Sequence, residues 1–511
     1  MILSVIYHIT NALTFVLAMI YFIHMFQLNG YHRDAHLRWT KDNAGAICAR
    51  LTFVFLSFVC VCVPFNFLRA LAVVFNAVSI YFLLPKKAKK PLVYTMRIKR
   101  LITTCILIYI VFFAVGKFAN NIFLFVSLCV IVSNFVVLFS DILNAPLEKA
   151  VKLHYINDAK KILKSHKNLK IIGITGSYGK TSCKYFLTKI LSAKYNVLMT
   201  PESYNTPMGV VRTVREMMKN HHEIFVCEMG AKNIGDIKEL CDIVYPQHGI
   251  ITSVGPQHLE SFKKIENVVS TKFELCDAIP DNGKIYLNYD NEYIRNRKTD
   301  KKVISYGCEY ESCDYFAKNI TVSERGTDFD VCKGDNVYHF STKLLGRHNV
   351  QNLVGCIALA LDFGVEYNDI SLAVLRLESV PHRLQMIDGG NITIIDDAFN
   401  ANPSGTKAAL EVLSAFNGVK VIVTPGMIEL GNKQNELNME FGKNCAAVCD
   451  YILLVGKKIA DSVYDGVMQT DFDKQKLLRF DTVQQAVEFA RSLNVSGKKF
   501  VLLENDLPDN Y

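Results

Sequence analysis

The stretch Ile171–Leu191, IIGITGSYGKTSCKYFLTKIL, decides the fold of the central part of the chain. It begins with apolar residues typical of a buried strand, passes through a glycine-containing turn and continues with apolar residues at helical spacing. We therefore predict a strand over 169–174, a turn over 175–181 and a helix that begins near Lys180.

The turn has the residue types that bind phosphate. Gly176, Ser177 and Gly179 let backbone N–H groups converge on phosphate oxygens, and the N-terminus of the next helix adds positive potential. Lys180 would reach the β- and γ-phosphates, and Thr181 would coordinate Mg²⁺. The common pattern G-x-x-x-x-G-K-[ST] is incomplete, because Ile174 holds the first glycine position. The order of strand, GKT and helix nevertheless predicts ATP binding with Mg²⁺.

Composition limits the classes of protein to consider. The chain has 511 residues, of which 50% are hydrophobic, a net charge of +9 and 15 cysteines. The cysteines lack the paired spacing of a zinc site or a disulfide framework, which favours a reduced, cytosolic environment for the soluble part. The excess basic residues flank apolar segments, and no nucleic-acid-binding motif accompanies them. We therefore predict no nucleic-acid partner.

The first 145 residues have the pattern of a multi-pass membrane region. Apolar runs cover 3–27, 47–63, 67–84, 101–118 and 122–140, and several are close to the roughly 20 residues that cross a bilayer. Lysines and arginines concentrate in the loops 28–50 and 85–100. The positive-inside rule then predicts about five helices in contact with membrane lipid, with the N-terminus outside. The protein would lie in the cell membrane, with its catalytic domains in the cytoplasm.

The junction 145–163 has an amphipathic helical pattern. One face carries apolar residues and the other carries lysines; the apolar residues are Leu147, Val151, Tyr155, Ala159, Ile162 and Leu163. Such a helix lies on a membrane surface or packs against the domain that follows it. The sequence leaves both alternatives open.

Several polar motifs follow the glycine turn in a fixed order. ESYNTPMGV (202–210) contains Asn205 and Thr206, FVCEMGAKNIGDI (225–237) contains Glu228, ITSVGPQHLESF (251–262) contains His258, and VVSTKFEL (268–275) contains Lys272. LGRHNVQN (345–352) contains Asn349 and Asn352, PHRLQ (381–385) contains Arg383, and IIDDAFNANPSG (394–405) contains Asp397, Asn400 and Asn402. Each residue alone has an ordinary structural interpretation, such as an exposed lysine or a turn asparagine. Their order after one phosphate-binding turn points to a single site.

In this order the motifs resemble the Mur ligase family, the ATP-dependent amide ligases of peptidoglycan assembly, over about residues 150–511. IIDDAFNANPSG and GMIELG (426–431) resemble the branch that adds D-alanyl-D-alanine. The resemblance implies nucleotide contacts from Gly176, Ser177, Gly179, Lys180, Thr181, Asn349, Asn352, Arg383 and Asp397. It implies metal contacts from Thr181, Glu228, His258 and Lys272, catalytic roles for Lys180, Lys272 and His258, and substrate contacts from Asn205, Thr206, Asn400 and Asn402. It also implies that Lys272 is carbamylated.

The resemblance implies a reaction and a domain organisation. A substrate carboxylate would attack the γ-phosphate of ATP, and an amine would displace phosphate from the resulting acyl-phosphate. We expect an α-helical transmembrane region over 1–145, a P-loop ATPase-type α/β domain over 146–379 and a Rossmann-like ligase domain over 380–511. Strands and helices alternate in the last domain, over 392–396, 403–416, 419–424, 434–448 and 451–455.

The substrates are less well defined. We expect a muramyl-peptide precursor as acceptor and an amino acid or dipeptide as amine. Members of the D-alanyl-D-alanine branch have a soluble N-terminal domain for the UDP-sugar, and here the membrane region takes its place. The acceptor is therefore either UDP-linked or lipid-linked. Two alternatives remain: a membrane transport or scaffold protein with a regulatory nucleotide domain, and a related ligase for a non-wall substrate, as in folate polyglutamylation.

Overall fold

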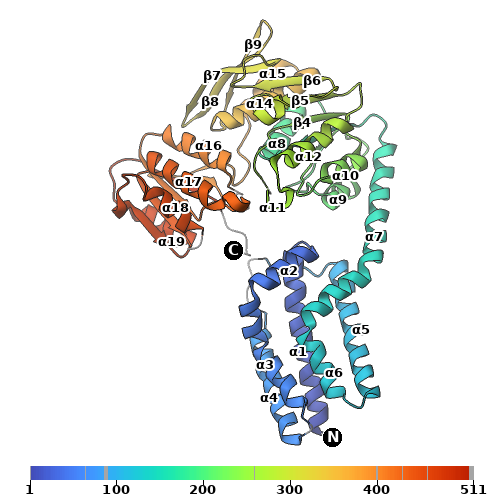
Figure 1. Ribbon diagram of the computed structural model, residues 1–511. Helices are drawn as coiled ribbons and strands as arrows, with labels where there is room; N and C mark the ends of the chain where they lie inside the picture. The colour runs from blue at the N-terminus through green and yellow to red at the C-terminus, as the bar shows by residue number, and fades with distance from the viewer. Residues whose placement is uncertain are drawn as a thin grey trace. The chain divides into compact units, whose positions relative to one another are not determined.

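The computed structural model describes residues 2–63, 65–85, 90–257, 259–398, 401–428, 430–456 and 459–505. The chain divides into two compact units, Met1–His154 and Tyr155–Tyr511. The first unit is helical, and the second contains two β-sheets (Figure 1).

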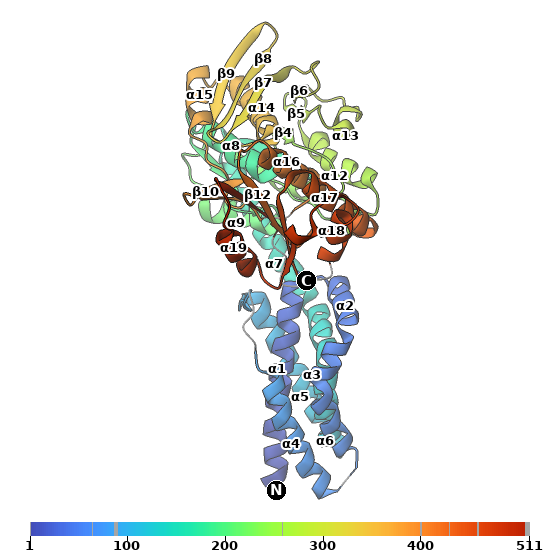
Figure 2. The same ribbon diagram turned by 90° about the vertical axis from the view of Figure 1, so that its left-hand side faces the viewer.

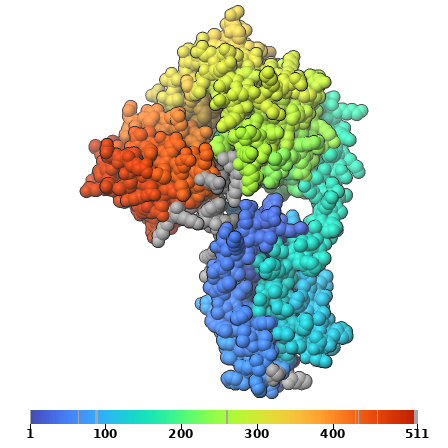
Figure 3. Space-filling model, viewed as in Figure 1, coloured from blue at the N-terminus to red at the C-terminus, as the bar shows by residue number. Residues whose placement is uncertain are grey.

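The helices of the first unit correspond to the predicted apolar runs. They are α1 (Ile2–Leu28), α2 (Arg33–Asp42), α3 (Ala44–Val61), α4 (Asn66–Leu83), α5 (Met96–Phe118), α6 (Ile122–Ile131) and the start of α7 (Ser133–Ser165). The helices α1, α3, α4 and α5 are long and apolar enough to cross a membrane, and α6 and α7 together form a further candidate that is bent by 80°. Figure 2 shows these helices side by side within the unit, and Figure 3 shows the packed surface that they form. The first four runs are confirmed as long apolar helices, and the fifth is a broken one.

Helix α7 continues through residue 145 and contributes to the core of the second unit. Ile156, Ala159 and Leu163 are buried together with Leu169 and Val210 of that unit. Leu147, on the same predicted face, is 51% exposed. The C-terminal half of the predicted amphipathic helix is therefore a docking helix, which decides between the two alternatives for that half.

The larger sheet of the second unit has nine strands in the order β2-β3-β1-β4-β5-β6-β7-β8-β9. The neighbours from β2 to β7 are parallel, and β7, β8 and β9 are antiparallel. The strands are β1 (Lys170–Thr175), β2 (Val197–Met199), β3 (Ile224–Glu228), β4 (His248–Ile251), β5 (Lys284–Asn288), β6 (Val303–Gly307), β7 (Tyr315–Ser323), β8 (Gly326–Lys333) and β9 (Asn336–Thr342). The associated helices are α8 (Lys180–Leu191), α9 (Pro207–Met217), α10 (Asp236–Val244), α11 (Leu259–Phe262), α12 (Ile265–Ala278), α13 (Glu292–Arg295), α14 (Arg347–Asp362) and α15 (Tyr367–Leu375).

Alternating side chains bury both faces of this sheet. Ile172 and Ile174 of β1 pack in one core with helices α8, α14 and α15. Ile171 packs in the opposite core with α9, α10, α12 and the end of α7. Parallel sheets are normally covered on both faces, because their crossover connections carry helices. The carboxyl ends of β1, β3 and β4 consequently share one edge, where the glycine turn lies.

The second sheet has six strands in the order β10-β11-β15-β12-β13-β14, and only β10 pairs antiparallel among the described strands. Its strands are β10 (Gln385–Asp388), β11 (Ile392–Asp397), β12 (Val419–Thr424), β13 (Tyr451–Val455), β14 (Leu477–Phe480) and β15 (Lys499–Glu504). Its helices are α16 (Pro403–Ser414), α17 (Gln434–Val448), α18 (Ala460–Val467), α19 (Val483–Ser492) and the 3-10 turns η1 (Gly431–Lys433) and η2 (Lys474–Lys476). Helices α16, α17 and α18 cover one face and α19 the other. The elements predicted over 392–455 agree with the structure to within two residues at each end.

Candidate active site

The glycine turn, residues 175–181, joins β1 to α8 in a conformation that requires its glycines. Gly176 has φ 154° and Gly179 has φ 79°. A Cβ atom at Gly176 would collide with the hydroxyl of Thr252, and one at Gly179 would lie 2.6 Å from Oδ1 of Asn352. The structure therefore places Asn352 of α14 directly against the turn.

The loop after β4 supports the first half of the turn. The Ser177 N–H donates to the Ser253 carbonyl at 2.7 Å, and the Tyr178 N–H donates to Ser253 Oγ at 3.0 Å. The Gly255 N–H donates to Ser177 Oγ at 3.0 Å. The N–H groups that remain are those at the start of α8, because the first N–H groups of a helix have no helical acceptor. Such a helix N-terminus is suited to bind an anion.

Lys180 lies within this turn, and its side-chain nitrogen donates hydrogen bonds to backbone carbonyls of the turn itself. Its Nζ donates to the carbonyls of Gly176 at 2.7 Å and Ser177 at 3.0 Å. Burial lowers the pKa of Lys180 to about 8, with a smaller opposing effect from Glu228 and a further lowering from Arg383. A bound phosphate would raise this pKa again, because an adjacent negative charge favours the protonated lysine.

Glu228 ends β3 and lies opposite Ile174 in the register between β1 and β3. The Thr181 hydroxyl donates to Glu228 Oε1 at 3.2 Å, and Asn205 Nδ2 donates to the same oxygen at 3.0 Å. Lys184, one helical turn beyond Lys180, forms an ion pair with Oε2 at 3.0 Å. Glu228 and Lys184 are only 1% and 2% exposed. Four side chains thus meet beside the turn.

The residues around Glu228 fit a magnesium ion. The Lys184 contact lacks hydrogen-bond geometry, so the buried Oε2 atom accepts no hydrogen bond from the residues that the structure describes. Mg²⁺ is commonly bound through one or two carboxylates, waters and substrate phosphates. Thr181 and Glu228 supply that partial set beside the anion-binding helix end. The described residues contain no cluster of three His, Cys, Asp or Glu side chains that would form a complete protein cage.

Lys272 lies on α12 and is almost completely buried, at 2% exposure. Burial lowers its pKa well below the usual range, and the charge of Lys180 lowers it further. No hydrogen bond or ion pair joins the Lys272 side chain to another residue in the described ranges. These conditions favour an uncharged amine at this position.

Among the asparagines and threonines predicted as site residues, one contacts the Glu228 carboxylate and others make hydrogen bonds to the backbone. Asn205 contacts Glu228, while Thr206 caps α9 by accepting from the Gly209 N–H at 3.4 Å. Asn402 caps α16 in the same way, through the Gly405 N–H at 2.9 Å. Asn349 donates to the Leu345 carbonyl at 2.8 Å. Thr206 and Asn402 thus have structural roles in helix capping, besides any contact with substrate.

Arg383 and Asp397 come together at the start of the second sheet. Burial lowers the pKa of Arg383, while the charges of Asp397, Glu228 and Glu504 raise it. Burial raises the pKa of Asp397 to about 6, and Arg383 opposes that rise. The Leu384 N–H also donates to Asp397 Oδ1 at 3.1 Å. Arg383 is therefore within electrostatic range of both the Glu228 cluster and the carboxylates of the second sheet.

Two predicted site residues, His258 and Asn400, lie outside the described residues. One residue that the sequence analysis did not select, Lys184, is part of the Glu228 cluster. Its position four residues after Lys180 was a usable signal, because residues four apart share a helix face.

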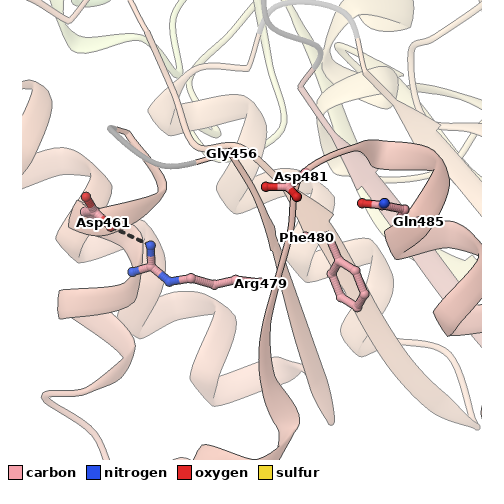
Figure 4. A pocket seen from close by; sticks show the side chains of 6 residues that line it. All are labelled: Gly456, Asp461, Arg479, Phe480, Asp481 and Gln485. Carbon is pink, nitrogen blue, oxygen red and sulfur yellow. Dashed lines mark hydrogen bonds and ion pairs between the residues drawn. The ribbon is translucent and has the colours of Figure 1, made fainter.

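A separate surface pocket lies at the carboxyl ends of β13 and β14 (Figure 4). It is lined by Gly456, Asp461, Arg479, Phe480, Asp481 and Gln485. Arg479 and Asp461 form an ion pair at 2.5 Å, and both are partly exposed. No predicted site residue lines this pocket, and exposed ion pairs contribute little to stability.

Comparison with known proteins extends these observations over most of the second unit. Residues 174–360 match the Mur ligase middle domain, and residues 382–504 match the Mur ligase glutamate ligase domain. The UDP-N-acetylmuramoyl-tripeptide--D-alanyl-D-alanine ligase of Escherichia coli (strain K12) is 30% identical over 341 residues, covering 66% of this chain and 75% of that protein. The ligase of the same name from Bacillus subtilis (strain 168) is 29% identical over 350 residues, covering 66% and 72%.

Solved structures agree with the sequence comparisons. MurF from Acinetobacter baumannii superposes with a TM-score of 0.64 at 28% identity, covering 70% of this chain and 77% of that one. MurF ligase from Thermotoga maritima in complex with ADP gives 0.62 at 25% identity, covering 70% and 80%. The matched domains begin at residue 174, so the helices α1 to α6 lie outside them.

Proposed function

The chain belongs to the Mur ligase family, whose members are ATP-dependent amide-bond ligases, and we propose that it joins an amine to a muramyl-peptide carboxylate at the membrane. The amine we favour is D-alanyl-D-alanine, the substrate that the names of the relatives give. The observation that carries the proposal is the buried cluster of Glu228, Thr181 and Lys184 beside the glycine turn.

The first step of this reaction brings two anions together. The acceptor carboxylate attacks the γ-phosphate, so positive charge at that point lowers the barrier. Lys180 supplies one charge, and the N–H groups at the start of α8 supply a positive potential. Gly176, Ser177 and Gly179 allow the phosphates to approach the backbone, as in a P-loop. Asn349 and Asn352 of α14 would contact the nucleotide from the side of the turn.

Magnesium would be held by Thr181 and Glu228, with His258 and a modified Lys272 at a second position. When bound, Mg²⁺ neutralises charge on the phosphates. Lys184 keeps the Glu228 carboxylate in place through their ion pair. A buried, uncharged Lys272 amine is the form that reacts with carbon dioxide. The carbamate that forms, with release of one proton, would carry a negative charge and offer oxygen ligands at the second metal position.

The second step needs the amine beside the acyl-phosphate. We propose that residues 380–511, a Rossmann-like domain, present the amine, while residues 146–379 bind ATP. Arg383 would contact the nucleotide, with Asp397 orienting it. Asn205, Thr206, Asn400 and Asn402 would contact the substrates on either side.

The membrane helices would bring this chemistry to the cytoplasmic leaflet. Residues 1–145 lie outside the matched domains, and α1, α3, α4 and α5 are apolar enough to span a bilayer. This arrangement suits a multi-pass cell-membrane protein whose acceptor is lipid-linked, with a UDP-linked acceptor as the alternative.

A product assay tests the proposed function. The full chain in detergent is given ATP, Mg²⁺, D-alanyl-D-alanine and either UDP-N-acetylmuramoyl-tripeptide or its lipid-linked counterpart, and products are identified by mass. We expect an ATP-dependent amide product, most readily with the lipid-linked acceptor. A Lys180→Ala variant should stay in the membrane fraction and form no product. Absence of product with both acceptors, or full activity of Lys180→Ala, would contradict the proposal.

A further inference from the structure

The end of β15 carries a carboxylate that the proposed mechanism does not use. Glu504 is the last residue of β15 and pairs in register with Asp397, the last residue of β11. Its side chain is 1% exposed, and within the described part of the chain neither of its carboxylate oxygens accepts a hydrogen bond. A buried carboxylate normally has a hydrogen-bonding or charged partner, so this arrangement requires an explanation.

The local charges do not balance. Asp397 and Glu504 both interact with the charge of Arg383. The adjacent Asp396 has a partner of its own, His382, whose Nδ1 lies 2.8 Å from Oδ2. Among the residues that the structure describes, two carboxylates therefore share one guanidinium in a buried position. Burial, reinforced by Asp397, raises the pKa of Glu504 well above its usual range. Glu504 is therefore held in its protonated form until a cation arrives, and that cation would favour its ionised form.

The pair lies where a ligand can reach it. The carboxyl ends of parallel strands form the usual ligand-binding edge of an open α/β sheet. Asp397 is only partly buried, while Glu504 lies deeper, so an incoming cation meets Asp397 first. Asn505 joins the surrounding loops, since its Nδ2 donates to the Gly426 carbonyl at 2.6 Å and its Oδ1 accepts from the Ala401 N–H at 3.4 Å.

Arg383 connects this pair electrostatically to the glycine turn. The charge of Arg383 acts on Lys180, and the charge of Glu228 acts on Arg383. Arg383 is thus close enough to act electrostatically on both the glycine turn and the pair of carboxylates. Among the reactants of an amide ligase, ATP and the acceptor carboxylate are anions, and the amine is the one that arrives as a cation.

We propose that Asp397 and Glu504 form the subsite that receives the ammonium group of the incoming amine. Asp397 contacts the ammonium, and Glu504, which lies deeper, is a positioning residue that ionises when the ammonium arrives and then supplies the second negative charge. This inference rests on the proposed ligase function, and it identifies the substrate class that the second sheet recognises: a primary ammonium group.

Binding measurements on the full chain test the subsite. D-alanyl-D-alanine is compared with D-lactyl-D-alanine, in which a hydroxyl replaces the ammonium, in the presence of Mg²⁺ and a non-hydrolysable ATP analogue. We expect the wild type to bind the ammonium form at least tenfold more tightly. Glu504→Gln, which keeps the side-chain shape, should lose roughly tenfold or more of that preference. Glu488→Gln, an exposed glutamate on α19, should retain it.

Turnover separates this inference from the proposed function. In Glu504→Gln the KM for the amine should rise roughly tenfold or more, while the KM for ATP and the thermal midpoint stay unchanged. A wild type that forms the amide while Glu504→Gln keeps the normal amine KM would overturn the subsite alone. The wild type could form no amide and still prefer the ammonium form. If Glu504→Gln then lacks that preference, the result would support the subsite and count against the proposed function. Absence of any ammonium preference in the wild type would overturn the subsite.

Discussion

Lys184 and Glu228 form an ion pair in which both side chains are almost completely buried. Removing one member of such a pair leaves an uncompensated charge, which costs about 3 kcal/mol or more. Lys184→Met should therefore lower the midpoint of thermal unfolding of the purified chain. Lys189→Met, an exposed position on the same helix, is the control and should change little. The double variant Lys184→Met/Glu228→Gln should recover most of the loss; an unchanged midpoint in Lys184→Met would refute the pairing.

The lowered pKa of Lys180, to about 8, predicts how nucleotide affinity depends on pH. Below this pKa the free protein already holds the ammonium form that phosphate requires. Above it the lysine is neutral, and binding must take up a proton. The affinity for a non-hydrolysable ATP analogue should fall by up to roughly tenfold per pH unit above about pH 8. In Lys180→Arg, which stays charged, this fall should disappear. Equal pH profiles for the two proteins would contradict the assignment.

Among single residues, the sequence predicted the positions of those whose type a motif ties to a particular place on the backbone. The glycines at 176 and 179 and the carboxylate at 228 lie where the motifs predicted, because each follows directly from the end of a strand. Lys184 and Glu504 were not selected, since their significance depends on burial and on partners distant in sequence. A carboxylate at the end of an apolar strand has no local signal that separates a ligand-binding residue from a solvated one.

Among the elements, helix α7 makes the sharpest prediction. Ala159 is fully buried in the core shared by α7 and the larger sheet. Ala159→Asp would place an unpaired charge in that core and should destabilise the second unit by several kcal/mol, roughly 3 or more. Lys161→Asp, an exposed position on the same helix, is the matched control. Limited proteolysis would report the difference, and equal protection of both variants would mean that α7 does not dock.

Elements whose apolar residues recur with a clear helical or strand period could be predicted. Elements defined by pairing with distant parts of the chain could not. The strand–turn–helix at 170–191 and the alternating elements over 392–455 match the structure closely. The hairpins β7 to β9 were not predicted, although buried and more exposed residues alternate along β8 and at the end of β9. None of the motifs in the sequence analysis falls on these strands. Helix α2 was also not predicted, since its polar sequence resembles a basic loop. The break between α6 and α7 lies inside an apolar run that carries no proline or glycine at that point.

For the whole molecule, the charge pattern predicts an orientation that thiol labelling can test. Cys62 is exposed after the end of α3, and Cys48 is exposed near its start. The positive-inside rule places Cys62 outside and Cys48 on the cytoplasmic side. A membrane-impermeant thiol reagent applied to intact cells should label the chain through Cys62, and Cys62→Ser should remove that label. Labelling that depends on Cys48 instead would mean that the orientation is the reverse of the predicted one. The active site would then face away from the cytoplasm, where ATP is.

If the glycine turn holds ATP in order to activate a carboxylate, an oxygen atom of that carboxylate must leave in the released phosphate. The most direct test follows oxygen from the acceptor whose turnover the product assay detects. Its terminal carboxylate is labelled with ¹⁸O, the full chain is supplied with ATP, Mg²⁺ and D-alanyl-D-alanine, and the released phosphate is analysed by mass. Transfer through an acyl-phosphate predicts one ¹⁸O atom in each phosphate released during amide formation. Phosphate whose added oxygen comes only from water would mean that ATP is hydrolysed without activating the carboxylate, and would contradict the account.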